Sequence, residues 1–184
     1  MLRWLVNRQM KAFERKFDYD LSYAREMFDA SPRAFWRFSR ISGMSNHREG
    51  VPLDAWYAAK IAATLSEDCG PCTQLVVTMA EREGVSPASL RAILAADQQA
   101  MPDDVALGFH FTRAVLARDI AESDRLRAEI LKLWGPRAVV SLALAIASSR
   151  VFPNIKYALG HGHACSRVQV AGASAPLAHR ESRA

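Results

Sequence analysis

The sequence contains only three cysteines in 184 residues, and this scarcity excludes the disulfide-rich scaffold of small secreted proteins. Two of them lie close together at Cys69 and Cys72, which leaves Cys165 outside the pair. An isolated cysteine pair of this kind is typical of a reducing compartment, so the sequence predicts a cytoplasmic protein. The pair would then act as a redox or metal-binding element.

Long apolar runs are also missing. Residues 1–6 are mostly apolar, but this run is far too short for the core of a signal peptide, and Asn7-Arg8 ends it. The longest apolar stretch, within residues 139–151, ends well short of the roughly 20 residues that a membrane span needs. We therefore expect no targeting segment and no membrane partner. The stretch predicts a buried helix over 137–152, followed by a short helix at 155–159.

Strand patterns are absent as well, because no segment shows convincing alternation, a hairpin dipeptide or a βαβ order. The fold class predicted is all-α. The net charge is +5, yet the arginines are distributed among acidic residues without a basic stripe and interleaved aromatics. This pattern predicts a solvated basic surface and no nucleic-acid partner.

Apolar residues recur at helical spacing along nearly the whole chain. Ser31-Pro32 and Ser86-Pro87 each combine a capping side chain with a first-turn proline, which predicts that helices begin there. We expect an N-terminal helical extension over residues 1–50 and one helical domain over residues 51–170. Residues 171–184 have no periodicity and predict a mobile tail.

The most informative motif is Cys69-Gly70-Pro71-Cys72, placed where a helix should begin. Asp68 is a plausible N-cap, and Pro71 suits the first turn because it has no N–H group to leave unpaired. The positive end of the helix dipole would favour thiolate over thiol. The spacing therefore predicts reversible dithiol–disulfide chemistry. A zinc site and an inert pair of buried cysteines are the alternatives.

On the same predicted helix, Cys72, Leu75, Val76 and Met79 fall at the i, i+3, i+4, i+7 spacing of one apolar face. The tetrapeptide itself also occurs in thioredoxins, where it follows a buried strand. Here the preceding run, residues 58–65, is alanine-rich and favours a helix. The context therefore argues against a thioredoxin centre.

A cysteine pair heading a helix in an all-α chain of this size resembles the AhpD-like alkylhydroperoxidases of the carboxymuconolactone decarboxylase superfamily. The resemblance covers roughly residues 51–160 and includes the helix before the motif, the Gly84-Val85-Ser86 turn and the later amphipathic and apolar helices. It implies a single-domain AhpD-like helical bundle, to which the N-terminal extension is added. It also implies a homo-oligomer, because members assemble through helices.

The resemblance further implies roles for the two cysteines. Cys72 would attack a small-molecule peroxide and become a sulfenic acid, and Cys69 would resolve it to a disulfide. An external dithiol reductant, such as a lipoyl protein, would restore the thiols. No cofactor and no metal are implied. The alternatives are a general dithiol–disulfide reductase and a non-catalytic helical oligomerisation or redox-sensing protein.

The sequence departs from the family pattern at the proton relay. Val76 stands where a histidine is expected, and Tyr57 stands where a glutamate is expected. Glu67 is the best substitute by position, although an acidic residue near a helix start is equally explained by the helix dipole. We interpret Tyr57 and Lys60 as packing and surface residues. His110 is interpreted as a core histidine.

One further segment, His161-Gly162-His163-Ala164-Cys165, carries the donor types of a soft metal site. Its one-residue spacings do not suit a helix face, and no second pair nearby completes a tetrahedral set. We therefore expect this segment to be structural or simply to lie next to the tail.

Overall fold

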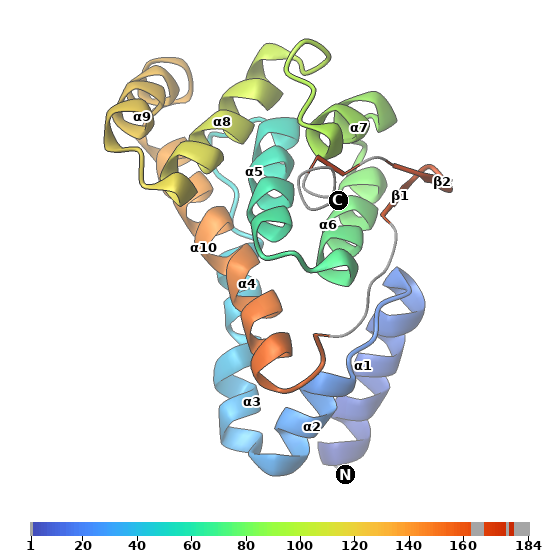
Figure 1. The fold of residues 1–184 in the computed structure, drawn as a ribbon. Helices are drawn as coiled ribbons and strands as arrows, with labels where there is room; N and C mark the ends of the chain where they lie inside the picture. The colour runs from blue at the N-terminus through green and yellow to red at the C-terminus, as the bar shows by residue number, and fades with distance from the viewer. Residues whose placement is uncertain (1, 163–167, 176, 179–184) are drawn as a thin grey trace.

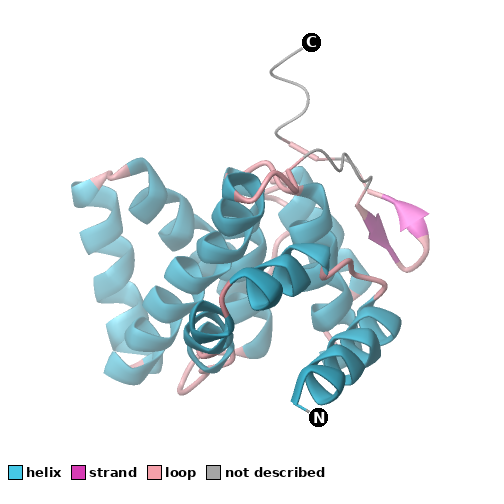
Figure 2. Cartoon of the chain, turned by 90° about the horizontal axis from the view of Figure 1, so that it is seen from below, coloured by secondary structure: helices cyan, strands magenta, loops and turns pink. Residues whose placement is uncertain are grey.

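The computed structural model describes residues 2–162, 168–175 and 177–178 and confirms the all-α prediction. Helices form one domain, and a short strand pair lies at its edge (Figures 1 and 2). The helices are α1 Leu2–Phe17, α2 Ser22–Ala30, α3 Pro32–Ser39, α4 Ile41–Ser45, α5 Leu53–Ser66, α6 Gly70–Glu83, α7 Pro87–Ala95, α8 Asp103–Ala117, α9 Ile120–Trp134 and α10 Pro136–Ala158.

Helix α5 runs through the centre of the fold, with α6, α7, α8 and α10 around it (Figure 1). Every residue from Ala55 to Thr64 is buried, and five of these ten are alanines, whose small side chains allow neighbouring helices to approach closely. The contact with α8 is tightest at Gly108, where any side chain would collide with the main chain of Ala55. Glycine at this position therefore sets the distance between the two helices.

The helix starts follow the predicted capping signals in two cases. Ser31 accepts a hydrogen bond from the third residue after it at 3.3 Å, and Ser86 does the same at 3.0 Å. The prediction that Asp68 caps α6 is wrong. Asp68 has a φ of +51°, and Cys69 occupies the N-cap position instead. The turn after α5 uses Asp68 to reverse the chain, so the helix starts one residue later.

Helix α10 is a single 23-residue helix, and it contains Pro153. The separate short helix expected at 155–159 is therefore the end of α10. The proline removes one main-chain hydrogen bond, but the residues on either side stay packed, since Phe152 contacts Phe38 of α3 and Ile155 packs against the N-terminal apolar residues. By length and composition α10 could cross a membrane. This is weak evidence for a membrane span, because core helices of soluble proteins can have the same length and composition. In α10, Leu142 and Ala145 are fully buried.

The first three helices carry a second apolar cluster beside the main core. Its buried members include Val6, Met10 and Phe28, and it packs against Leu75 of α6 and Ile155 of α10. This cluster covers the start of α6, with α1, α2 and α3 at the lower end of Figure 1. The N-terminal segment is therefore part of the packing around the cysteine motif.

The chain after α10 differs from the predicted tail. Strands β1 Gln169–Val170 and β2 Ala173–Ser174 pair antiparallel, with a turn at residues 171–172. Val168 and Val170 pack into the main core, and the Ala171 N–H donates to Glu81 at 2.6 Å. Burial of the alternating valines holds this part of the chain, so the tail does not begin at residue 171. Residues 176 and 179–184 lie outside the described residues.

Candidate redox site

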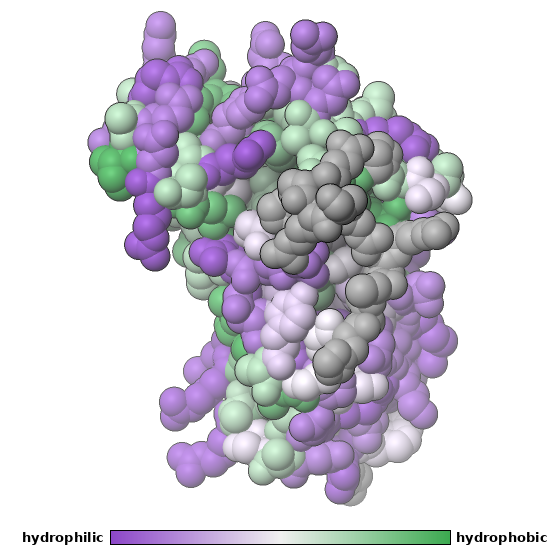
Figure 3. All heavy atoms as spheres, viewed as in Figure 1, coloured by the Kyte–Doolittle hydropathy of each residue, from purple (hydrophilic) through white to green (hydrophobic). Residues whose placement is uncertain are grey.

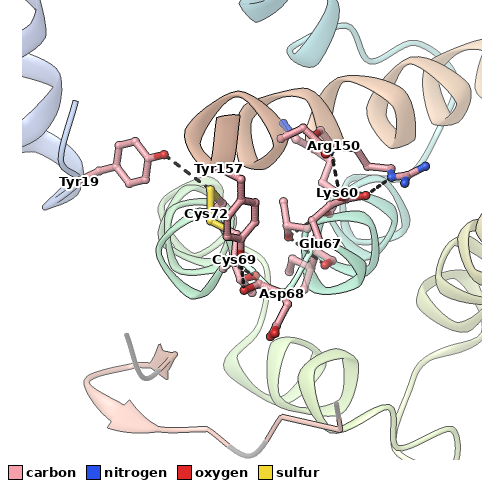
Figure 4. The surroundings of a disulfide bond; sticks show 12 residues. Tyr19, Lys60, Glu67, Asp68, Cys69, Cys72, Arg150 and Tyr157 are labelled. Atoms are coloured by element: carbon pink, nitrogen blue, oxygen red, sulfur yellow. Dashed lines mark hydrogen bonds and ion pairs between the residues drawn. A yellow bond between two sulfur atoms is a disulfide. The ribbon is translucent and has the colours of Figure 1, made fainter. Parts of the chain in front are cut away.

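The cysteine pair lies at the start of α6, as the motif predicted. The sulfur atoms of Cys69 and Cys72 are at disulfide distance, with 5.3 Å between their Cα atoms (Figure 4). Cys69 is the N-cap residue and Cys72 lies in the first turn, so both sulfurs are close to the positive end of the helix dipole. After reduction, the helix dipole would favour ionisation of both thiols, and their burial would oppose it.

Tyr19 contacts the cysteine motif from the N-terminal segment, and sequence reasoning missed it. Its hydroxyl lies 3.7 Å from the Cys72 sulfur (Figure 4). A disulfide sulfur carries no hydrogen, so the tyrosine is the donor. Tyr19 lies in the connection between α1 and α2. Glu14 fixes this connection, because its carboxylate accepts a hydrogen bond from the Leu21 N–H at 3.0 Å and pairs with Arg25. No motif marks Tyr19, because its role depends on how α1 and α2 pack onto α6.

Burial raises the pKa of Tyr19 far above its usual range, and the neighbouring Tyr23 raises it further. Burial likewise raises the pKa of Tyr23 to about 12. Lys156 lies over the Tyr19 ring, with its nitrogen 4.9 Å from the ring centroid. Burial lowers the pKa of Lys156, while Asp20 opposes this shift. The Tyr19 hydroxyl therefore stays protonated at neutral pH and can donate to a sulfur anion but not act as a base.

A cavity of about 310 Å³ lies between the N-terminal helices and the start of α6. One wall is the predicted apolar face of α6, since Cys72, Leu75, Val76 and Met79 all line it. Cys72 is 3 % exposed, and its side chain forms part of the cavity wall. The opposite wall is apolar and largely aromatic and includes Met10, Phe13, Tyr23, Phe35, Phe38 and Phe152.

Lys60 also lines this cavity, so its interpretation as a surface residue is wrong. The side chain is 3 % exposed, donates to the Ser45 carbonyl at 3.0 Å and lies 4.0 Å from the Trp56 ring centroid. Burial lowers the pKa of Lys60 to about 8, and Glu83 opposes this shift. A lysine with this pKa can give up a proton near neutral pH, which a surface lysine cannot.

The other relay candidates lie in different surroundings. Tyr57 is a packing residue, as interpreted, and its hydroxyl donates to Glu83 at 2.8 Å. Burial first, and then this hydrogen bond, raises the pKa of Tyr57. Glu67 pairs with Arg150 and accepts a hydrogen bond from Asn154 at 2.9 Å, so α10 holds its carboxylate (Figure 4).

His110 lies on α8 with its ring 5.6 Å from that of Phe109. It is half-buried and is not among the residues that line the cavity. Burial lowers its pKa, and the nearby Arg113 adds to this effect. His110 is therefore separated from the cysteine chemistry by the fold.

Within the described residues, no group of three histidine, cysteine or acidic side chains could hold a metal ion. His161, from the segment with metal-donor residues, lies 2.8 Å from the Glu26 carboxylate on α2. His163 and Cys165 lie outside the described residues.

Comparison of the chain with models of protein families, with curated proteins and with solved structures found no match. The function must therefore be argued from the geometry of the site.

Proposed function

We propose that this chain is a thiol-dependent peroxidase of the AhpD-like type, which reduces organic hydroperoxides through Cys72 and Cys69. One observation carries the proposal. The Cys72 sulfur lines an apolar cavity, with a second cysteine at disulfide distance and a protonated tyrosine as donor. These are a nucleophile, a resolving thiol and a hydrogen-bond donor around a space that admits a small apolar molecule.

In the proposed cycle the Cys72 thiolate attacks the distal oxygen of the hydroperoxide and the O–O bond breaks. The sulfur becomes a sulfenic acid, and the alkoxide takes up a proton to leave as an alcohol. The Cys69 thiol then attacks the sulfenic sulfur, which forms the disulfide and releases water. An external dithiol, such as a lipoyl-bearing protein, reduces the disulfide and is itself oxidised to a disulfide.

The surroundings of the cysteines support a small apolar substrate. A large protein disulfide could not enter a cavity of about 310 Å³ to reach Cys72. Aromatic and aliphatic walls favour an organic hydroperoxide over hydrogen peroxide, because burying an apolar group contributes about 25 cal/mol per Å². Val76 cannot relay a proton, so the thiolate must be stabilised by the helix dipole and by Tyr19. Such a site would work more slowly than one with a full relay.

The proposal includes a homo-oligomer in a reducing, cytoplasmic environment. Exposed apolar side chains on α9 and α10, including Ile120, Leu133 and Val140, support an interface on these helices. In Figure 3, hydrophobic residues are exposed among hydrophilic ones in the upper left region, where α9 lies. Light scattering after size-exclusion chromatography tests this part, and a monomer at all concentrations would contradict it.

Stopped-flow oxidation of the reduced chain tests the chemistry, in a Cys165→Ser background that removes the third thiol. We expect cumene hydroperoxide to oxidise Cys72 faster than it oxidises free cysteine. Cys72→Ser should abolish turnover, whereas Cys69→Ser should accumulate a sulfenic acid at Cys72. If peroxide oxidises Cys72 no faster than it oxidises free cysteine, but a lipoyl disulfide exchanges quickly with the cysteine pair, the chain is a reductase. If both reactions are slow, the pair has no catalytic role.

A further inference from the structure

Lys60 is a buried cation without a carboxylate partner. No ion pair joins it to an acidic side chain among the described residues. Its ammonium donates to one main-chain carbonyl and faces the Trp56 ring, although an ammonium group has three donors. Proteins rarely bury a charge without a counter-ion. The remaining donors of Lys60 are therefore available to an anionic ligand.

Ser149 is a second unsatisfied group on the same cavity. It is 3 % exposed, and its hydroxyl has no hydrogen-bond partner among the described residues. The preceding residue behaves as helical serines usually do, because Ser148 donates to the carbonyl of Leu144 at 2.7 Å. Ser149 lines the cavity and leaves its donor unused there.

The polar and apolar linings come largely from different parts of the fold. Ser45 on α4, Lys60 and Thr64 on α5 and Ser149 on α10 contribute polar groups where α10 packs on α4 and α5. Helices α1 to α3 contribute mainly aromatic and aliphatic side chains, among them Phe13, Phe35 and Phe38, although Ser39 of α3 also lines the cavity. The cavity is therefore amphipathic, and it suits a molecule with one anionic end and an apolar body.

We propose that this cavity binds a carboxylate with an apolar tail, of the class of medium-chain fatty acids, with its carboxylate held by Lys60 and Ser149. The ammonium and the hydroxyl both donate to the carboxylate oxygens, and the tail replaces water against the aromatic wall. Binding itself does not depend on the peroxidase chemistry. A second consequence does rest on the proposed function, namely that hydroperoxides of such acids are the preferred substrates at Cys72.

Isothermal titration calorimetry of the full, oxidised chain with decanoate and with decanol tests the binding site without any redox step. We expect decanoate to bind about 10- to 100-fold more tightly than decanol, the range given by one hydrogen bond between charged groups. Equal affinity of the two ligands, or no binding of decanoate, would overturn the proposal. This comparison uses only the unchanged chain, so it does not depend on a variant folding.

Two variants then test whether Lys60 and Ser149 bind the carboxylate of decanoate. Lys60→Met keeps the length of the side chain and should weaken decanoate binding about 10- to 100-fold while leaving decanol binding unchanged. Ser149→Ala should weaken decanoate binding by less, because it removes one neutral donor. Lys132→Met, at an exposed position of α9, is the matched control and should change nothing. If circular dichroism shows that Lys60→Met is folded and the variant binds decanoate with unchanged affinity, Lys60 does not hold the carboxylate and the proposal is refuted.

Discussion

The hydrogen bond from Tyr19 to the Cys72 sulfur provides the sharpest test of the site. In Tyr19→Phe the ring stays in place and only the hydroxyl, 3.7 Å from the sulfur, is removed. A hydrogen bond to a charged group contributes about 1.5–3 kcal/mol, and the long contact to a soft acceptor favours the lower end. Since one pKa unit corresponds to about 1.4 kcal/mol, we expect the pKa of the Cys72 thiol to rise by about one unit.

This pKa rise has two opposing effects on the rate of oxidation. Below the pKa of both forms, the thiolate fraction of the variant falls about tenfold, while each thiolate gains about threefold in nucleophilicity from its higher basicity. The variant should therefore react about threefold more slowly at low pH. Above both pKa values it should react faster than the unchanged chain by a similar factor. The two pH–rate profiles should cross.

Thiol titration by ultraviolet absorbance at 240 nm, together with stopped-flow rates from pH 5 to 10, measures both quantities. Tyr57→Phe is the matched control, because it removes a buried hydroxyl that bonds Glu83 and not the sulfur. It should leave the pKa of Cys72 unchanged. If Tyr19→Phe lowers the rate by the same factor at every pH, or leaves the thiol pKa unaltered, the donor role of Tyr19 is refuted.

Three further predictions follow from other contacts. Gly108→Ala should lower the free energy of unfolding by about 1–3 kcal/mol, because the new methyl group collides with α5. Gly43→Ala is the control, because the space around Gly43 is open. It should raise the free energy of unfolding by about 0.5–1 kcal/mol. The depressed pKa of Lys60, about 8 against 10.5, means that the unfolded chain binds more protons between these values. Stability should therefore rise by about 3 kcal/mol from pH 8 to 10.5 through this residue. Lys60→Met should lack that contribution. Glu67→Gln should leave the peroxide rate nearly unchanged, because Arg150 holds the carboxylate.

Urea unfolding at several pH values checks the first two of these. Equal stabilities of Gly108→Ala and Gly43→Ala would show that the α5–α8 contact is looser than described. A pH dependence that is the same with and without Lys60 would mean that its ammonium is well solvated. A fall of about 100-fold or more in Glu67→Gln, the usual effect of losing a general acid or base, would show that Glu67 takes part in catalysis.

Local sequence signals predicted much of the secondary structure. Ser31 and Ser86 cap helices as predicted, since a capping side chain and a first-turn proline act within a few residues of each other. Local capping signals also predicted Asp68 as the N-cap of α6, which is wrong. Asp68 has a left-handed conformation that depends on how the turn after α5 packs. The continuation of α10 through Pro153 was missed for a related reason. Contacts of Phe152 and Ile155 with the N-terminal helices hold α10 there, and they come from distant parts of the chain.

The sequence by itself determined the all-α fold, the helix that begins at the cysteine pair and the apolar face that carries Cys72. Helical spacing and capping are properties of neighbouring residues, so they can be read along the chain. Only the tertiary structure decided what surrounds the sulfur. Tyr19 lies 53 residues before Cys72, and Lys60 and Ser149 come from two further helices. Packing of the N-terminal helices against α6 and α10 brings these groups to one cavity, and no spacing in the sequence encodes that arrangement.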